Sequence, residues 1–72
     1  MRTAQQLFDE NFTNNPTREK RSKAYKFGVM AVLNFKIHGV GYGEVPFKAG
    51  TAAFDAYFAG MAEGNNILAR GN

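Results

Sequence analysis

The fold of this chain is decided by one stretch, Phe27-Gly-Val-Met-Ala-Val-Leu-Asn-Phe-Lys-Ile37. It contains no proline, and its apolar side chains cover nearly the whole circumference of a helix. A helical segment of this kind is buried on more than one side. We therefore expect it to belong to the central helix of a small all-α domain, or to contact a partner with one of its sides.

The central helix is expected to begin well before Phe27. Asn15 is a favourable N-cap and Pro16 suits the first helical position, while Gly39 is the expected C-terminal stop. The first half of this helix is charged, because residues 18–26 hold five basic residues and one acidic residue.

A third helix is predicted to begin at the N-cap Thr51 and to end near Gly64. Its apolar face is marked by residues spaced i, i+3, i+4 and i+7, namely Phe54, Tyr57, Phe58 and Met61. Gly28 in the second helix and Gly60 in the third each cost about 1 kcal/mol relative to alanine. We expect them to mark the point where the two helix backbones approach each other.

A short helix is predicted ahead of this helical hairpin. Thr3 and Gln6 have the spacing of a capping box, and residues 11–16 end the helix with asparagines and a proline. A helix this short is marginal in water, so its apolar edge must dock on the rest of the chain. That edge consists of Leu7, Phe8 and Phe12.

The connector, residues 39–50, contains four glycines and one proline, which rules out a helix. The spacing Gly39-x-Gly41-x-Gly43 does not fit a dinucleotide or phosphate-binding loop, so we interpret it as part of a flexible connector. Its larger side chains are expected to fold over the helices: Val40, Tyr42, Val45 and Phe47. The remaining aromatic residues are expected to lie mostly in the core, among them Phe27, Phe35, Phe54, Tyr57 and Phe58.

Length and composition bound the class of protein. Seventy-two residues suffice for one small domain, with the short helix in residues 1–14 and the hairpin in residues 15–72. The chain has no cysteine, which excludes disulfides and thiolate zinc sites. Because so few groups are available to furnish a cleft, we expect no enzyme activity, no metal and no cofactor. His38, the single histidine, is expected to be a capping or surface residue.

The basic charge is concentrated in the first half of the chain. Residues 1–38 hold seven Lys or Arg and three Asp or Glu, whereas residues 39–72 hold two and three. Positive charge near a helix N-terminus opposes the helix dipole, which favours a functional use such as binding phosphates. A solvated helix end is the alternative. The candidate phosphate contacts are Arg18, Lys20, Arg21, Lys23 and Lys26, and Tyr25 is a candidate for stacking on an exposed base.

Targeting signals are not evident in the sequence. The most apolar run, residues 27–35, is nine residues long, and a membrane span needs about 20. The N-terminus has no apolar core followed by a cleavage site. We therefore expect a cytoplasmic protein with no membrane partner.

Three short motifs resemble the ribosome modulation factor family. They are Pro46-Phe47-x-x-Gly50-Thr51 followed by Ala56-Tyr57-x-x-Gly60-Met61, and, upstream, Ala24-x-x-x-Gly28-x-x-Ala31. The match covers roughly residues 24–64. The resemblance implies two helices joined by an extended connector, with Gly28 and Gly60 as packing positions. It also implies binding to ribosomal RNA through residues 18–26 and Lys36.

The sequence therefore favours a small, non-catalytic modulator that binds RNA or the ribosome. The alternative is a protein-binding module, such as a phage-type inhibitor of a host enzyme or a homodimer. That alternative predicts exposed apolar side chains and binding that is insensitive to salt.

Overall fold

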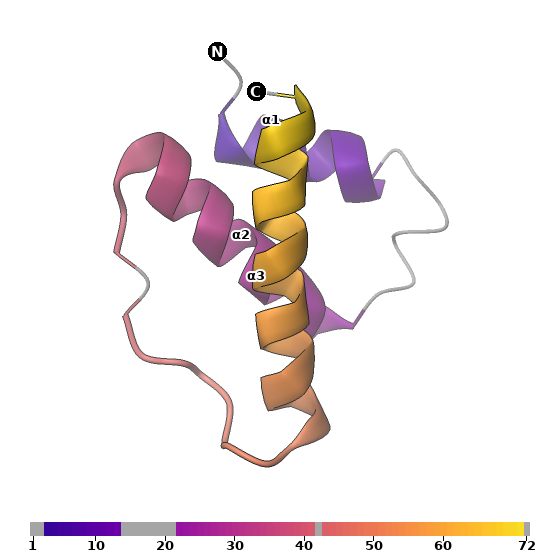
Figure 1. The fold of residues 1–72 in the computed structure, drawn as a ribbon, viewed down its shortest axis with the longest axis vertical. Helices are drawn as coiled ribbons and strands as arrows, with labels where there is room; N and C mark the ends of the chain where they lie inside the picture. Colours follow the sequence, from indigo (N-terminus) through magenta and orange to yellow (C-terminus); the bar gives the residue numbers. More distant parts are fainter. Residues whose placement is uncertain (1–2, 14–21, 42, 72) are drawn as a thin grey trace.

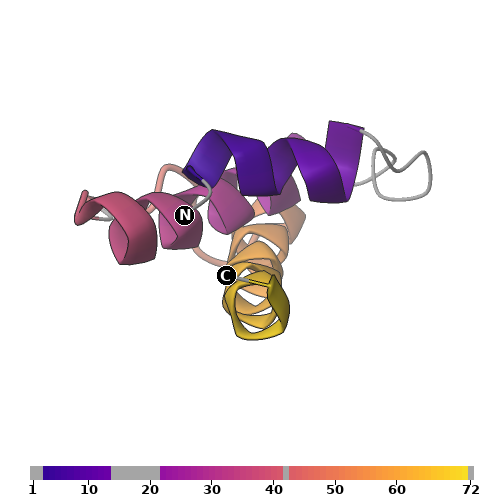
Figure 2. The same cartoon turned by 90° about the horizontal axis from the view of Figure 1, so that it is seen from above.

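The computed structural model describes residues 3–13, 22–41 and 43–71. They form α1 (Ala4–Phe8), the π-helix η1 (Asp9–Thr13), α2 (Lys23–His38) and α3 (Ala52–Gly71). α2 and α3 cross as a helical hairpin, and α1 with η1 lies across one end of it (Figure 1). Figure 2 shows α2 running between the α1–η1 segment and α3. The expected all-α hairpin with a short N-terminal helix and a central helix is confirmed.

The predicted start of α2 is wrong. Ser22 has an extended backbone, and its Oγ accepts a hydrogen bond from the Tyr25 N–H at 3.2 Å, so it is the N-cap of a helix that begins at Lys23. The expected cap at Asn15 and Pro16 lies outside the described residues. The predicted stop at Gly39 is confirmed, because its φ of 74° is left-handed and its N–H donates to the Phe35 carbonyl at 3.0 Å.

The third helix begins as predicted and ends later than predicted. Thr51 Oγ1 accepts a hydrogen bond from the Phe54 N–H at 3.1 Å, as an N-cap does. Gly64 does not end the helix, which continues to Gly71. Gly64 instead lies against α2, where a Cβ would stand 2.9 Å from the Cβ of Val32. The absence of a side chain at Gly64 therefore allows α2 and α3 to pack closely.

The two helix backbones touch at Gly28 and Gly60, as the sequence predicts. A Cβ on Gly28 would overlap the carbonyl oxygen of Tyr57 and stand 2.9 Å from the backbone nitrogen of Met61. A Cβ on Gly60 would overlap the carbonyl oxygen of Tyr25. Real side-chain carbons do not approach backbone atoms this closely, so only glycine permits this crossing.

The face that α3 presents to α2 differs from the predicted one. Gly60 and Gly64 lie at the crossing, with Tyr57 and Ile67 buried on either side of them. Phe58, expected on the apolar core face, is 44% exposed, and Phe54 and Met61 are only half-buried. The reason is the closeness of the backbones, which leaves no room for large side chains between them and displaces the rings to the flanks.

The N-terminal segment docks on the hairpin through the predicted edge. Leu7 is buried and Phe12 is 1% exposed, while Phe8 stacks on Phe12 with ring centroids 4.8 Å apart. The core lies where α1, η1, α2 and the second half of α3 meet, and its buried members are Ala4, Leu7, Phe12, Val29, Leu33 and Ile67. This burial is what stabilises a helix too short to persist alone.

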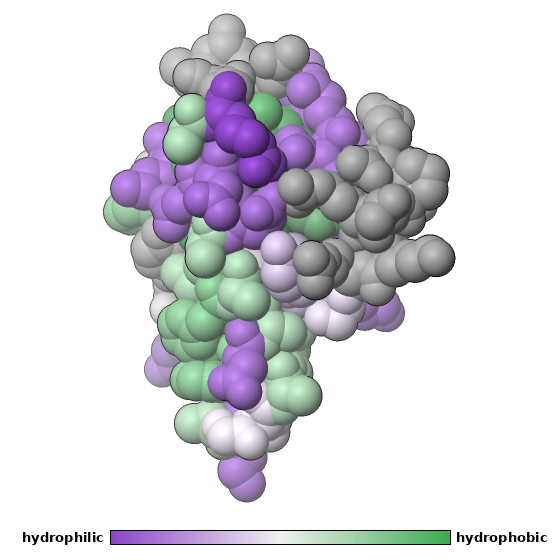
Figure 3. All heavy atoms as spheres, turned by 45° about the vertical axis from the view of Figure 1, so that its right-hand side comes forward, coloured by the Kyte–Doolittle hydropathy of each residue, from purple (hydrophilic) through white to green (hydrophobic). Residues whose placement is uncertain are grey.

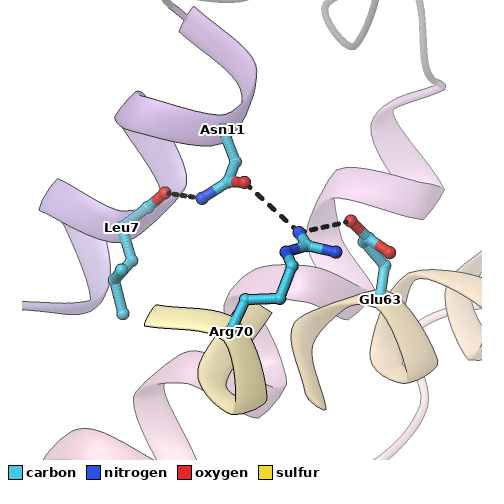
Figure 4. Close-up of polar contacts among 4 residues, drawn as sticks. All are labelled: Leu7, Asn11, Glu63 and Arg70. Atoms are coloured by element: carbon cyan, nitrogen blue, oxygen red, sulfur yellow. Dashed lines mark hydrogen bonds and ion pairs between the residues drawn. The ribbon is translucent and has the colours of Figure 1, made fainter. Parts of the chain in front are cut away.

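Polar contacts tie the N-terminal segment to both long helices. The backbone N–H of Ala4 donates to Nε2 of His38, the last residue of α2, at 3.2 Å. Nη2 of Arg70 lies 3.2 Å from Glu63 Oε2 and 3.5 Å from Oδ1 of Asn11 in η1 (Figure 4). His38 therefore holds the start of α1, and Arg70 joins the end of α3 to η1.

The connector behaves as predicted in its backbone and less so in its side chains. Gly43 and Gly50 have left-handed φ values of 68° and 86°, and no helix or strand forms between Gly39 and Gly50 in its described residues. Of the side chains expected to fold inward, Val40 and Val45 are exposed, and Tyr42 lies outside the described residues. Phe47 does pack, with its ring centroid 5.8 Å from that of Tyr57.

Candidate nucleic-acid interface

Two lysines of the predicted basic site, Lys23 and Lys26, lie at the start of α2. Lys23 is the first residue of the helix and is exposed, whereas Lys26 is half-buried. Together with Phe27 and Met30 they occupy positions i, i+3, i+4 and i+7, which place them on one helical face. The cationic end of α2 is therefore combined with apolar side chains.

These side chains line a shallow hollow of about 310 Å³ between α2 and the N-terminal segment. Its lining consists of Phe8, Lys23, Lys26, Phe27 and Met30. Phe27 is 58% exposed, the most exposed large hydrophobic residue in the described chain. The ring of Phe8 stacks on that of the buried Phe12. The hollow is thus an apolar surface with an exposed ring and a cationic edge.

Tyr25, the residue predicted to stack on a base, lies elsewhere. It is half-buried, packs against the core, and contacts the ring of Phe12 edge-on at 6.3 Å between centroids. The ring available in the hollow is that of Phe27.

The other predicted contacts are not brought to this hollow. Lys36 is about 20 Å further along α2 than Lys23 and about 140° around the helix from it. Its Nζ lies 5.8 Å from the ring centroid of the neighbouring Phe35. Arg18, Lys20 and Arg21 lie outside the described residues.

The expectation that the aromatic residues are mostly core is wrong for Phe27, Phe35 and Phe58, which are exposed. For Phe27 the reason is geometric. Gly28 faces the backbone of α3, and Phe27 lies about 100° around α2 from Gly28, so its ring is not covered by α3. The ring of Phe27 makes a T-shaped contact with that of Phe47, with 6.1 Å between centroids. The signal available in the sequence was the i, i+3, i+4, i+7 spacing that joins Phe27 to two lysines.

A second hollow, of about 290 Å³, lies on the other side of Phe27, between α2 and the connector. Phe27 and Met30 line both hollows, but the lining of this one includes Asn34 and Glu44 and no lysine. The ridge formed by Phe27 therefore separates a cationic hollow from one with a carboxylate on its lining.

A separate apolar surface lies over the first half of α3. Figure 3 shows hydrophobic residues gathered over the lower half of the molecule, where α3 begins, and hydrophilic residues over the upper half. Phe58 is an exposed residue in the first half of α3, with its ring centroid 4.8 Å from that of Phe54.

Within residues 3–13, 22–41 and 43–71, no three His, Asp or Glu side chains gather in a way that would hold a metal ion. In the same part of the chain, no helix combines the length and apolar character needed to cross a membrane. No protein-family model, curated protein or solved structure matches this chain.

Proposed function

We propose that this protein is a small, non-catalytic RNA-binding modulator, with the ribosome as its target. The observation that carries the proposal is the exposed ring of Phe27 in a hollow edged by Lys23 and Lys26. Proteins that bind RNA outside regular duplexes combine cations for the phosphates with aromatic rings on which bases stack. This hollow offers both.

The position of Lys23 supports a role outside the fold. It is the first residue of α2, and the first turn of that helix contains no acidic residue. The helix dipole favours negative charge at this end, so a lysine there costs a few tenths of a kcal/mol relative to an acid. A cation that the helix itself does not favour is well placed for a phosphate. The sequence adds further bases just upstream, since residues 18–26 hold five.

The resemblance of residues 24–64 to the ribosome modulation factor family supports the ribosome as the source of the RNA. The close contact at Gly28 and Gly60 fits the packing role that the resemblance assigns to them.

The first test is the substitution Lys23→Glu, with Lys48→Glu as a control of equal charge change on the exposed connector. We expect Lys23→Glu to weaken co-sedimentation with ribosomes and to lower the salt dependence of RNA affinity by about one unit of slope. Lys48→Glu is expected to do neither. Since a glutamate at this helix end is favoured by the dipole, Lys23→Glu should not lower thermal stability, which separates lost binding from unfolding.

A stronger variant reverses three charges together, at Lys20, Arg21 and Lys23. It is expected to abolish co-sedimentation of a chain that remains folded by circular dichroism. Retained binding by this variant contradicts the proposal.

The alternative, a protein-binding module or homodimer, is favoured by a different observation, the exposed Phe58 beside Phe54 on α3. The same salt titration separates the two functions. Binding to RNA falls steeply as salt rises, whereas association driven by burial of these aromatic rings does not.

A further inference from the structure

We propose that the ligand of the hollow beside Lys23 is single-stranded RNA, with one unpaired base seated against the ring of Phe27. This inference rests on the proposed function and names the form of RNA that the site takes. It follows from the shape of the hollow, the support behind its rings and the charges on either side of Phe27.

The rings in the hollow are held in place before any ligand arrives. Phe8 is stacked at 4.8 Å on Phe12, which is buried. Phe27 makes a T-shaped contact with Phe47, with 6.1 Å between centroids, and is 58% exposed. A ring that is fixed in position loses little conformational entropy when a base stacks on it. The hollow is therefore a preformed stacking surface.

A regular duplex does not fit this surface. The bases of an RNA helix are stacked on one another, and the deep, narrow major groove keeps side chains from them. Phe27 rises from a helix surface within an open hollow, so it reaches a base only when that base is unpaired. A loop, bulge or free strand supplies such a base.

The charges on the two sides of Phe27 set the course of the RNA backbone. Lys23 and Lys26 line the hollow toward the N-terminal segment, while Glu44 lines the hollow on the other side. A phosphate is attracted by the first pair and repelled by the carboxylate. The strand therefore runs along the lysine side, with the base turned inward onto the ring.

The lining also predicts weak sequence preference. Apart from the two lysines, its members are Phe8, Phe27 and Met30, whose side chains offer no ordinary hydrogen-bond donor to a base edge. Base edges then remain in water, and affinity follows stacking strength. Oligo(A) is expected to bind more tightly than oligo(U).

The experiment measures fluorescence anisotropy of the full chain with labelled oligo(A), with the same strand carrying abasic nucleotides, and with an RNA duplex of equal length. Phe27→Ala is expected to weaken oligo(A) binding at least about fivefold and to leave duplex binding unchanged. Phe58→Ala, an equally large truncation of an exposed ring away from the hollow, is the matched control and should change neither. The abasic strand should bind the wild type as weakly as oligo(A) binds Phe27→Ala.

A second variant, Phe27→Leu, distinguishes a loss of RNA binding from a loss of folding. Phe27→Leu keeps an apolar side chain at this exposed position and removes the aromatic face, so it should weaken oligo(A) binding while the circular dichroism spectrum stays that of the wild type. If Phe27→Leu and Phe27→Ala both bind oligo(A) like the wild type while Lys23→Glu does not, the seated base is wrong and RNA binding stands. If the wild type binds no RNA, and Phe27 is instead needed for salt-insensitive capture of a protein, the RNA function fails and this inference fails with it.

Discussion

Gly28 and Gly60 lie against each other's helix in a reciprocal contact. The missing side chain of Gly28 faces the carbonyl oxygen of Tyr57, and that of Gly60 faces the carbonyl oxygen of Tyr25. Each tyrosine precedes its own glycine by three residues, so the pattern Tyr-x-x-Gly in α2 meets the same pattern in α3. The hairpin is thus joined at a nearly symmetric point of backbone contact.

This contact predicts a large effect for a small substitution. Gly28→Ala gains about 1 kcal/mol of helix propensity, but its Cβ would overlap backbone atoms of α3. We expect a net loss of roughly 2 kcal/mol or more in the free energy of unfolding, measured with urea. Gly60→Ala should behave alike.

Gly41→Ala is the control for that experiment, because a Cβ there meets nothing within 4 Å and the φ of Gly41 is not left-handed. Its stability should remain close to that of the wild type. A Gly28→Ala variant that is more stable than the wild type would show that the helices do not touch at this point.

The docking of the N-terminal segment is tested at Phe12. This ring is fully buried and packs with Phe8 and Tyr25. Phe12→Ala should lower the free energy of unfolding by about 3–5 kcal/mol, a large part of the total stability of so small a domain. Phe58→Ala should cost much less, because that ring is 44% exposed. Equal losses in the two variants would contradict the assigned core.

The contact of Ala4 with His38 is tested by hydrogen exchange. The Ala4 N–H is part-buried and donates to Nε2 of His38, so His38→Ala leaves it without this acceptor. We expect faster exchange at Ala4 and a loss of about 1 kcal/mol in stability. His38→Gln, which retains an acceptor oxygen, should restore part of the protection. Exchange that is the same in all three proteins would rule the contact out.

Much of the fold follows from local chemistry. Gly39 ends α2 because a left-handed residue satisfies the last carbonyls, and Thr51 begins α3 because its hydroxyl accepts an early backbone N–H. The start of α2 shows the limit of this reasoning. Asn15 and Ser22 are both good N-caps, and local chemistry does not choose between them. The cap formed in the described structure is Ser22.

Only part of the candidate site could be predicted from the sequence. The lysines at the start of α2 stand out as a charge cluster, and Lys23 is indeed exposed. The exposed ring beside them was expected in the core. Hydrophobicity indicates that a side chain tends to be buried, but whether another helix covers Phe27 depends on which face of α2 packs against α3.

By itself, the sequence determined that this chain is a helical hairpin with an N-terminal helix, where the connector lies, and that two glycines meet. Caps, breakers and the cost of glycine within a helix are properties of neighbouring residues, so they can be recognised without coordinates. Only the tertiary structure decided which face of α3 packs on α2, that Gly64 continues the helix, and that Phe27 lies open between the lysines and Glu44. Those outcomes depend on how closely two helix axes approach, and that distance is set by side chains far apart in the sequence acting together.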